Sequence, residues 1–445
     1  MVRSPVGLAT AVTAAGALAF AGALAIAVPA SAADVNTPPV RTIAGSHTTL
    51  NSIYGLAFGA DGTTYVTTYP GNVPAIAVFA PGATGNTAPE RVIAGSHTGF
   101  ADPGGLALDS AGHLWVVDFT AATIEEFAAG AHGNVAPIRT IVGSNTTLDS
   151  PTGITIGPTG TIYVADYGAG DVDVFDSAAT GNVAPTGTIV GSNTGFSEPY
   201  GVVLQSDGSL VVSDYVAETI STFASGATGN VSPLTSISGS NTQLSAPYYA
   251  AVDGAGNIYV ANYGGGSISE FVADATGNVT PTTRIIGAST DLDGPYPIAI
   301  NPSGQIFVGN YDLNTVGVFD TDLAINTVSP AKGTTDGGTT VTITGAGFDA
   351  GAAVTIDGQP ATDVTVVSPT KITFVTPAHT VGNVAIAVTD GGVTVTVAGG
   401  FTFIVVLATT GLDPAPGIGL GLLLLVAGAT VIAWRRRQLT GASRW

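Results

Sequence analysis

Short polar side chains recur at a fixed interval along the first three quarters of the chain. The series has a carboxylate or amide in five copies and a hydroxyl in a sixth: Asp118, Asp166, Asp214, Asn262, Asn310 and Thr68. Carboxylates that converge on one axis would suit Ca²⁺. A short acceptor repeated in nearly every copy is typical of a residue that binds neighbouring loop amides. The pattern favours this structural role, with Ca²⁺ held by Asp118, Asp166 and Asp214 as the alternative and no other cofactor expected.

Aromatic residues accompany this series. Each member is followed directly by a ring: Tyr69, Phe119, Tyr167, Tyr215, Tyr263 and Tyr311. A further position holds tyrosine in four copies only, at Tyr54, Tyr200, Tyr248 and Tyr296, and has Gly104 and Thr152 in the other two. Tyrosine rings stack on sugars or planar groups and offer a hydroxyl. The sequence predicts a ligand-binding mouth formed by Tyr54, Tyr200, Tyr248, Tyr296, Tyr167, Tyr215 and Tyr263, with loop packing as the alternative.

Residues for catalysis are not apparent. The chain has no HExxH, GxSxG or P-loop motif. His47 and His97 occupy equivalent loops, but no third metal ligand stands at a recognisable spacing. His113 and His132 are expected to be solvated in turns on the opposite face. Near-identical repeats single out no reacting atom, so we predict no catalytic residue and favour a binding protein. The alternative is an extracytoplasmic, metal-dependent lactonase or lyase.

The elements that must position these residues form a repeat. Asparagine recurs every 48 residues, at Asn86, Asn134, Asn182, Asn230, Asn278 and Asn326. Each copy contains four short β-type runs, and the fourth always ends in phenylalanine. Four antiparallel strands repeated six times predict a six-bladed β-propeller over residues 33–323. Its phenylalanines and a second aromatic series, which includes Tyr65 and Trp115, should form the core between blades. Because the last copy lacks an outer strand, Arg41–Ile43 should supply it.

The blades resemble a known repeat family. The run Ile162-Tyr163-Val164-Ala165-Asp166-Tyr167, followed by Val172-Asp173-Val174-Phe175, is similar to NHL repeats. The resemblance implies the propeller fold. Members of that family include lactonases, lyases and binding scaffolds, so it does not define an activity.

A second domain follows the repeats. Residues 324–404 read as alternating short strands, which predict an immunoglobulin-like β-sandwich. The segment from Gly337 to Phe348, the Thr376-Pro377-Ala378 run and the final Phe401-Thr402-Phe403 resemble an IPT/TIG domain. The resemblance implies a spacer or adhesive module.

The two ends carry targeting signals. Residues 1–32 have the order of a signal peptide, with cleavage predicted between Ala32 and Ala33. Residues 407–411 (LATTG), an apolar stretch at 416–434 and a basic tail at 435–445 predict a transmembrane helix with a cytoplasmic C-terminus. The order of parts resembles a sortase sorting signal, which implies cleavage between Thr410 and Gly411 and attachment to peptidoglycan. A retained membrane anchor is the alternative.

Charge and composition limit the partners. Between Ala33 and Thr410 the chain has six basic and 30 acidic residues, which disfavours nucleic acid. It has no cysteine, so neither disulfides nor thiolate chemistry can occur. The sequence as a whole predicts an all-β protein at the cell surface, with a signal peptide, a propeller, an Ig-like domain and one C-terminal transmembrane helix. Its expected partners are sortase, the cell wall and an unknown extracellular glycan or protein.

Overall fold

The computed structural model describes residues 33–302, 304–320, 323–348, 351–368, 371–390 and 393–405. These residues form β-strands and two short 3₁₀ helices, η1 (Pro70–Asn72) and η2 (Tyr263–Gly265). None of the helices in these ranges is long and apolar enough to cross a bilayer. The predicted signal peptide, LATTG motif, transmembrane segment and basic tail lie outside the described residues. The chain divides into two compact units, with the main division after Asn326.

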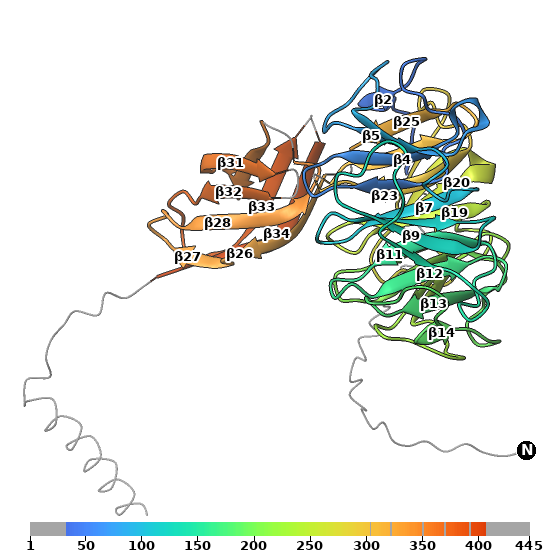
Figure 1. Cartoon of the computed structure of the whole chain (residues 1–445). Helices are drawn as coiled ribbons and strands as arrows, with labels where there is room; N and C mark the ends of the chain where they lie inside the picture. The colour runs from blue at the N-terminus through green and yellow to red at the C-terminus, as the bar shows by residue number, and fades with distance from the viewer. Residues whose placement is uncertain are drawn as a thin grey trace, which may run out of the picture. The chain divides into compact units, whose positions relative to one another are not determined.

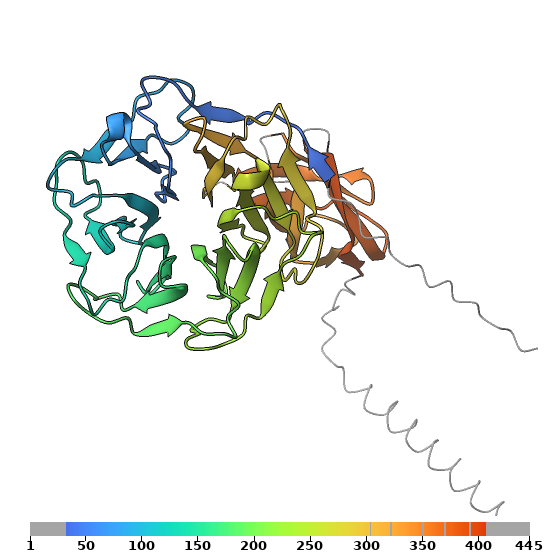
Figure 2. The same ribbon diagram turned by 90° about the vertical axis from the view of Figure 1, so that its right-hand side faces the viewer.

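The first unit contains six sheets arranged around a central axis (Figure 2). In each blade the strand that is named first below is innermost. Blade 1 contains β3 (Leu56–Phe58), β4 (Thr64–Thr68), β5 (Ala75–Phe79) and β6 (Arg91–Ala94). Blade 2 contains β7 (Pro103–Leu108), β8 (Leu114–Asp118), β9 (Thr123–Phe127) and β10 (Arg139–Ile141). Blade 3 contains β11 (Pro151–Ile156), β12 (Ile162–Asp166), β13 (Asp171–Phe175) and β14 (Gly187–Ile189).

The remaining three blades continue the ring. Blade 4 contains β15 (Pro199–Leu204), β16 (Leu210–Asp214), β17 (Thr219–Phe223) and β18 (Thr235–Ile237). Blade 5 contains β19 (Pro247–Val252), β20 (Ile258–Asn262), β21 (Ser267–Phe271), β22 (Thr283–Ile286) and, at its outer edge, β1 (Ala33–Val35). Blade 6 contains β23 (Pro295–Ile300), β24 (Ile306–Asn310), β25 (Thr315–Phe319) and β2 (Arg41–Ile43). The predicted six-bladed propeller is therefore confirmed.

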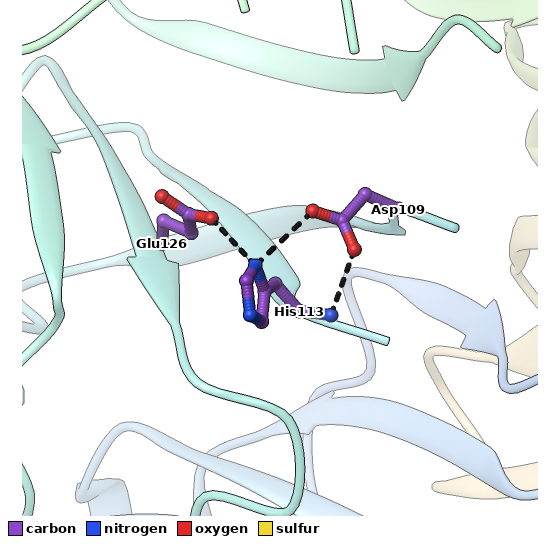
Figure 3. A group of neighbouring side chains, drawn as sticks. All are labelled: Asp109, His113 and Glu126. Carbon is purple, nitrogen blue, oxygen red and sulfur yellow. Dashed lines mark hydrogen bonds and ion pairs between the residues drawn. The ribbon is translucent and has the colours of Figure 1, made fainter. Parts of the chain in front are cut away.

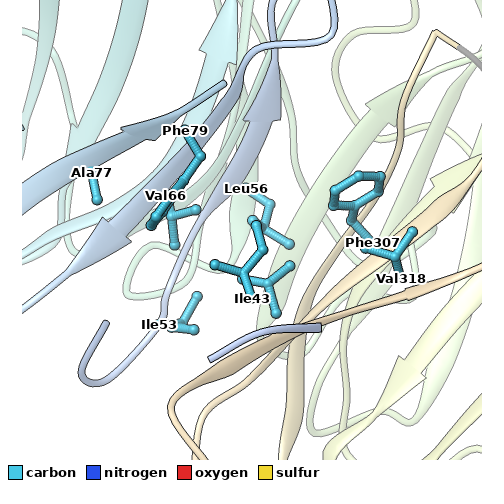
Figure 4. Packing of buried hydrophobic residues seen from close by; sticks show 9 residues of the cluster. Ile43, Ile53, Leu56, Val66, Ala77, Phe79, Phe307 and Val318 are labelled. Atoms are coloured by element: carbon cyan, nitrogen blue, oxygen red, sulfur yellow. The ribbon is translucent and has the colours of Figure 1, made fainter. Parts of the chain in front are cut away.

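The ring closes through the N-terminal segment. Strand β2 pairs antiparallel with β25, and Ile43 lies opposite Val316. Ile43 is fully buried in a cluster that joins Phe79 of blade 1 to Phe307 of blade 6 (Figure 4). The predicted contribution of Arg41–Ile43 to the last blade is thus confirmed. Strand β1 adds a second tie that the sequence did not predict, because it pairs in parallel with β22 of blade 5.

The repeated asparagines fasten one blade to the next. The Oδ1 atom of Asn134 accepts the amide of His97 at 2.7 Å. It lies against Gly95, whose φ of 123° favours glycine, and a Cβ atom there would be 2.6 Å from this oxygen. The sixth such contact comes from Asn36, which accepts the amide of Ser289 at 2.8 Å. Ring closure thus gives the sixth contact to Asn36, whereas Asn326 lies in β26 (Ala324–Ser329).

Aromatic side chains fill the space between blades, as predicted. The phenylalanines that end the third strands are at most 3% exposed: Phe79, Phe127, Phe175, Phe223, Phe271 and Phe319. Tyr65 of blade 1 packs in one cluster with Leu114 and Phe127 of blade 2. Trp115 lies correspondingly in the cluster between blades 2 and 3. These contacts make the blades mutually dependent.

The second unit is a two-sheet sandwich (Figure 1). One sheet has the order β26 (Ala324–Ser329), β28 (Thr340–Ala346), β32 (Lys371–Val375) and β31 (Thr362–Ser368). The other has the order β27 (Lys332–Thr334), β34 (Val393–Ile404), β33 (Gly382–Asp390), β29 (Ala353–Ile356) and β30 (Gln359–Pro360). Ile343, Ile356, Phe374 and Phe401 are at most 1% exposed and form part of its core. The predicted Ig-like sandwich is confirmed.

Candidate ligand-binding site

A β-bulge at the start of the innermost strand positions one side chain in each of blades 2 to 6. The pairing of β11 with β12 skips Thr152, and the pairing of β15 with β16 skips Tyr200. Strand β19 skips Tyr248 in the same way, and the irregular pairings of β7 and β23 include Gly104 and Tyr296. A bulge bends its strand and redirects the extra residue. The bulge positions are the ones in which tyrosine occurs in some blades and not in others.

The tyrosines at Tyr54, Tyr200, Tyr248 and Tyr296 pack on one another from different blades. Tyr54 of blade 1 meets Tyr296 of blade 6 edge-on, with ring centroids 5.6 Å apart. Tyr296 also contacts Tyr200 at 5.7 Å and Tyr248 at 4.3 Å. Aromatic pairs at such distances stabilise each other beyond the area they bury. The rings form a continuous cluster, and Tyr296 is only 7% exposed.

Hydrogen bonds between different blades hold this cluster. The hydroxyl of Tyr249 donates to the carbonyl oxygen of Thr152 at 2.8 Å. The hydroxyls of Tyr54 and Tyr311 lie 3.2 Å apart, and those of Tyr200 and Tyr296 are also hydrogen-bonded. Burial raises the pKa of Tyr54, Tyr200 and Tyr249 above the ordinary value. These hydroxyls therefore stay protonated at neutral pH and act as neutral hydrogen-bonding groups, without a phenolate base.

A cavity of ≈ 220 Å³ remains where two blades lack the tyrosine. Gly104 and Thr152 stand at the bulge in blades 2 and 3. Glycine has no side-chain heavy atom and threonine has a short side chain, so both positions leave space that a ring occupies in the other blades. The cavity is lined by Tyr54, Asp102, Pro103, Gly104, Phe119, Pro151, Thr152, Tyr200 and Tyr249. Pockets for drug-sized ligands span about 300–1,000 Å³. The cavity thus has room for a small molecule or for one group of a larger ligand.

Asp102 supplies the only carboxylate in the lining of this cavity. Its Oδ1 atom accepts the hydroxyl of Tyr69 at 2.6 Å, and its Oδ2 atom accepts that of Thr120 at 3.3 Å. The carboxylate is half-buried and fixed by these two donors. Aromatic faces together with a fixed carboxylate form a favourable environment for an organic cation or a hydrogen-bond donor.

All seven predicted tyrosines belong to one aromatic cluster. Tyr215 stacks on Tyr248 with centroids 4.6 Å apart, Tyr263 meets Tyr248 at 5.4 Å, and Tyr167 meets Tyr200 at 5.8 Å. Only Tyr54 and Tyr200 of the seven line the cavity. Their role in ligand binding stays a prediction. Sequence reasoning missed Asp102, Phe119 and Tyr249 as lining residues, although the exceptions at Gly104 and Thr152 were a visible signal.

The polar series binds backbone amides, as its repetition predicted. Asp118 accepts the amides of Ala101 at 2.7 Å and Ala121 at 2.8 Å. Asp214 accepts those of Ser197 at 2.7 Å and Ala217 at 2.8 Å. The other members also accept backbone amides: Asp166 from Asp149, Asn262 from Ser245, Asn310 from Asp293 and Thr68 from Asn51. Among the described residues, Asp166 belongs to a cluster of three carboxylates, whereas Asp118 and Asp214 belong to none.

The histidines contribute nothing to the mouth. The side chains of His47, His97 and His132 are exposed. The expectation that His113 is solvated was wrong, because its Nδ1 atom lies 2.9 Å from Glu126 and 3.3 Å from Asp109 (Figure 3). Glu126 also pairs with Arg139 at 2.5 Å. The predicted turn is present, but the hairpin brings His113 back onto two carboxylates of its own blade.

A second cavity, of ≈ 390 Å³, follows the axis. Backbone and aliphatic side chains from the innermost strands of all six blades line it, including Leu56, Leu106, Ile154, Val202 and Ile298. Tyr249 borders both this cavity and the smaller one. The axial cavity has no charged side chain in its lining, so the polar chemistry of the site lies at the mouth.

Comparisons with known proteins concern both units. No curated protein matches the chain. Among solved structures, it is similar to a streptogramin B lyase (16% identity, TM-score 0.43, covering 62% of this chain and 97% of that one). It is also similar to virginiamycin B lyase from Staphylococcus aureus (15%, TM-score 0.40, covering 75% and 97%) and to the WD40 β-propeller domain of Doa1 (12%, TM-score 0.42, covering 64% and 97%). Residues 323–404 match the IPT/TIG domain model, which identifies the sandwich as an IPT/TIG domain.

Proposed function

We propose that this chain is a cell-surface binding protein whose propeller presents the cavity at Gly104 and Thr152 to an extracellular ligand. The observation that carries the proposal is the asymmetry of the mouth, where four blades contribute a tyrosine and two leave a space beside Asp102. A structural ring would need no such difference between blades. The gap provides one site in an otherwise repetitive molecule.

The lining defines the ligand group. Tyr54, Phe119 and Tyr200 contribute aromatic rings to the lining, and Asp102 contributes a fixed carboxylate. Cations bind over aromatic faces with about 0.5–2 kcal/mol each, and more when desolvated. A protonated amine fits this combination, as carried by a lysine side chain or by an amino sugar. The acidic excess of the exported part favours the approach of such a group.

The hydrogen bonds of the polar series to loop amides support a binding protein rather than a metal-dependent lactonase or lyase. Asp118 and Asp214 already accept backbone amides, so they are occupied as loop supports.

The LATTG motif at 407–411 and the basic tail support attachment to the cell wall by a sortase. We expect the chain released from the wall to end at Thr410, which mass spectrometry can determine. Chain that instead retains residues 411–445 would show that the anchor is a membrane helix.

A variant that fills the cavity tests the binding proposal. The full chain is screened by calorimetry against amino sugars, cell-wall fragments, matrix proteins and lysine-containing peptides. A Cβ atom at Gly104 would come no closer than 3.5 Å to its neighbours, so Gly104→Tyr can be accommodated in blade 2. Binding by the wild type and its loss in Gly104→Tyr is the expected result. The control Tyr163→Phe alters a tyrosine of β12 that does not line the cavity, and it should retain binding. A screen in which no compound binds, or undiminished binding by Gly104→Tyr, would overturn the proposal.

A further inference from the structure

Three aspartates face one another inside blade 3. Asp166 ends β12, and Asp171 and Asp173 lie in β13. The register places Asp166 directly opposite Asp171, with Asp173 two residues further on the same face. One oxygen from each carboxylate lies within 4.8 Å of the others. Like charges directly opposite on a strand pair are destabilising, so this arrangement requires compensation.

The same three positions are arranged differently in the other blades. Blade 2 has Asp118, Thr123 and Glu125, and the Thr123 hydroxyl donates to Glu125. In blade 5 the amide of Asn262 donates to Ser269 at 3.0 Å, and in blade 6 that of Asn310 donates to Thr315 at 3.1 Å. Those blades each combine a donor with an acceptor. Blade 3 has three acceptors at these positions and no donor among them.

The surrounding groups compensate these three charges only in part. Asp166 accepts the amide of Asp149 at 2.6 Å, and Asp173 accepts the hydroxyls of Thr188 at 2.8 Å and Thr147 at 3.3 Å. Asp171 is 9% exposed, and its buried Oδ1 atom has no hydrogen-bond partner among the described residues. Within the same ranges, no arginine, lysine or histidine forms an ion pair with the three. A buried, unpaired carboxylate oxygen is costly unless a cation or a proton occupies it.

We propose that Asp166, Asp171 and Asp173 bind one Ca²⁺ ion inside blade 3. Ca²⁺ prefers carboxylate and other hard oxygen ligands at about 2.3–2.6 Å, so two ligands of one ion stand at most about 5 Å apart. The separations within the cluster meet that limit. The three negative charges exceed the charge of the ion, and water completes its coordination. The site differs from the series Asp118, Asp166 and Asp214, because all three of its ligands belong to a single blade.

The position of the cluster gives the ion a structural consequence. Asp173 contacts Thr147 in the loop before β11, and Asp166 binds the amide of Asp149 in that same loop. The loop leads directly to Pro151 and Thr152, which line the mouth cavity. An ion at the cluster therefore ties the edge of the cavity to the rigid strands of blade 3. This inference does not depend on the identity of the mouth ligand.

The test replaces the blade 3 pattern with that of blade 4. Asp171→Thr with Asp173→Ser reproduces Thr219 and Ser221, which blade 4 carries at the same positions. The full chain is freed of metal with a chelator, and Ca²⁺ is titrated by calorimetry and by thermal unfolding. The wild type should bind one ion per chain and gain Tm, and the double variant should lose both responses. The control Glu125→Gln, a buried acid of blade 2, should bind Ca²⁺ as the wild type does.

The outcomes distinguish a cluster that binds Ca²⁺ from one that is neutralised by protons. Burial raises the pKa of both Asp166 and Asp171 to about 7, so shared protons would satisfy the cluster if no ion did. A wild type that takes up no Ca²⁺ at millimolar concentration would overturn the proposal, as would a double variant that binds as tightly as the wild type. A folded double variant with a native circular dichroism spectrum and no Ca²⁺ response would support it.

Discussion

The hydroxyl of Tyr249 in blade 5 donates a 2.8 Å hydrogen bond to the carbonyl oxygen of Thr152 in blade 3. The bond joins the innermost strands of two blades that are separated in the ring by blade 4. Tyr249 also lines both cavities. The ring thus has an internal brace in addition to the contacts between adjacent blades.

Removing this brace should destabilise the propeller. Tyr249→Phe keeps the ring but leaves the carbonyl oxygen of Thr152 without its donor. An unsatisfied buried group costs about 1–3 kcal/mol, so the midpoint of denaturant unfolding should fall. Tyr163→Phe is the matched control, because no hydrogen bond of the Tyr163 hydroxyl occurs among the described residues, and it should change little. Equal stability of the two variants would show that the bond contributes nothing.

Closure of the ring predicts equal sensitivity at two positions distant in sequence. Ile43 of β2 and Ile141 of β10 both end the run Arg-Thr-Ile and are fully buried. Truncating a buried isoleucine costs about 2–5 kcal/mol. Ile43→Ala and Ile141→Ala should therefore lower the free energy of unfolding by similar amounts. A near-neutral Ile43→Ala beside a costly Ile141→Ala would mean that β2 is not docked in solution.

Two adjacent glycines should respond differently to alanine. A Cβ atom at Gly105 would lie 2.5 Å from the carbonyl oxygen of Thr152, whereas one at Gly104 would lie 3.5 Å from that same atom. Overpacking against backbone costs about 1–3 kcal/mol. Gly105→Ala should lower Tm by several degrees, and Gly104→Ala should leave it nearly unchanged. The reverse order would contradict the packing described at the mouth.

Stability should depend on pH through Glu125. Burial raises the pKa of this carboxyl to about 8, a hydrogen bond from Thr123 opposes the shift, and the charge of Asp118 adds to it. Its ordinary value is 4.5. Between pH 4.5 and 8 the folded state binds more protons than the unfolded state, so stability falls as pH rises through this range. Glu125→Gln should remove this contribution and gain stability relative to the wild type toward pH 8.

The comparison is made by denaturant unfolding across that range in the presence of a chelator. The chelator keeps the blade 3 cluster free of metal, so that its own titration contributes equally to both proteins. Parallel stability curves for the wild type and Glu125→Gln would contradict the assignment.

The regular part of this molecule could be read from the sequence, and its exceptions only partly. The period of 48 and the phenylalanine series predicted the blades, the core and the closure, because each blade repeats the same strand pattern and the same buried positions. The role of Asn36 could not be predicted, since Asn36 lies 50 residues before Asn86 and departs from the period of 48, and only the closed ring shows its contact. Tyr249 was missed because it stands one residue beyond the bulge series. His113 was misplaced because a turn in sequence does not show that Glu126 lies next to it.

The attachment of β1 and β2 also bears on the order in which the chain can fold. Ala33 pairs with Thr283 and Arg41 pairs with Val318, so the first two strands of the propeller pair with strands of its last two blades. Such non-local pairings slow folding, because a long chain must be closed before the contacts form. Blades 1 to 4 can assemble from local hairpins during synthesis. The complete propeller has to wait until residues near Phe319 are available, and until then its N-terminal strands remain unpaired.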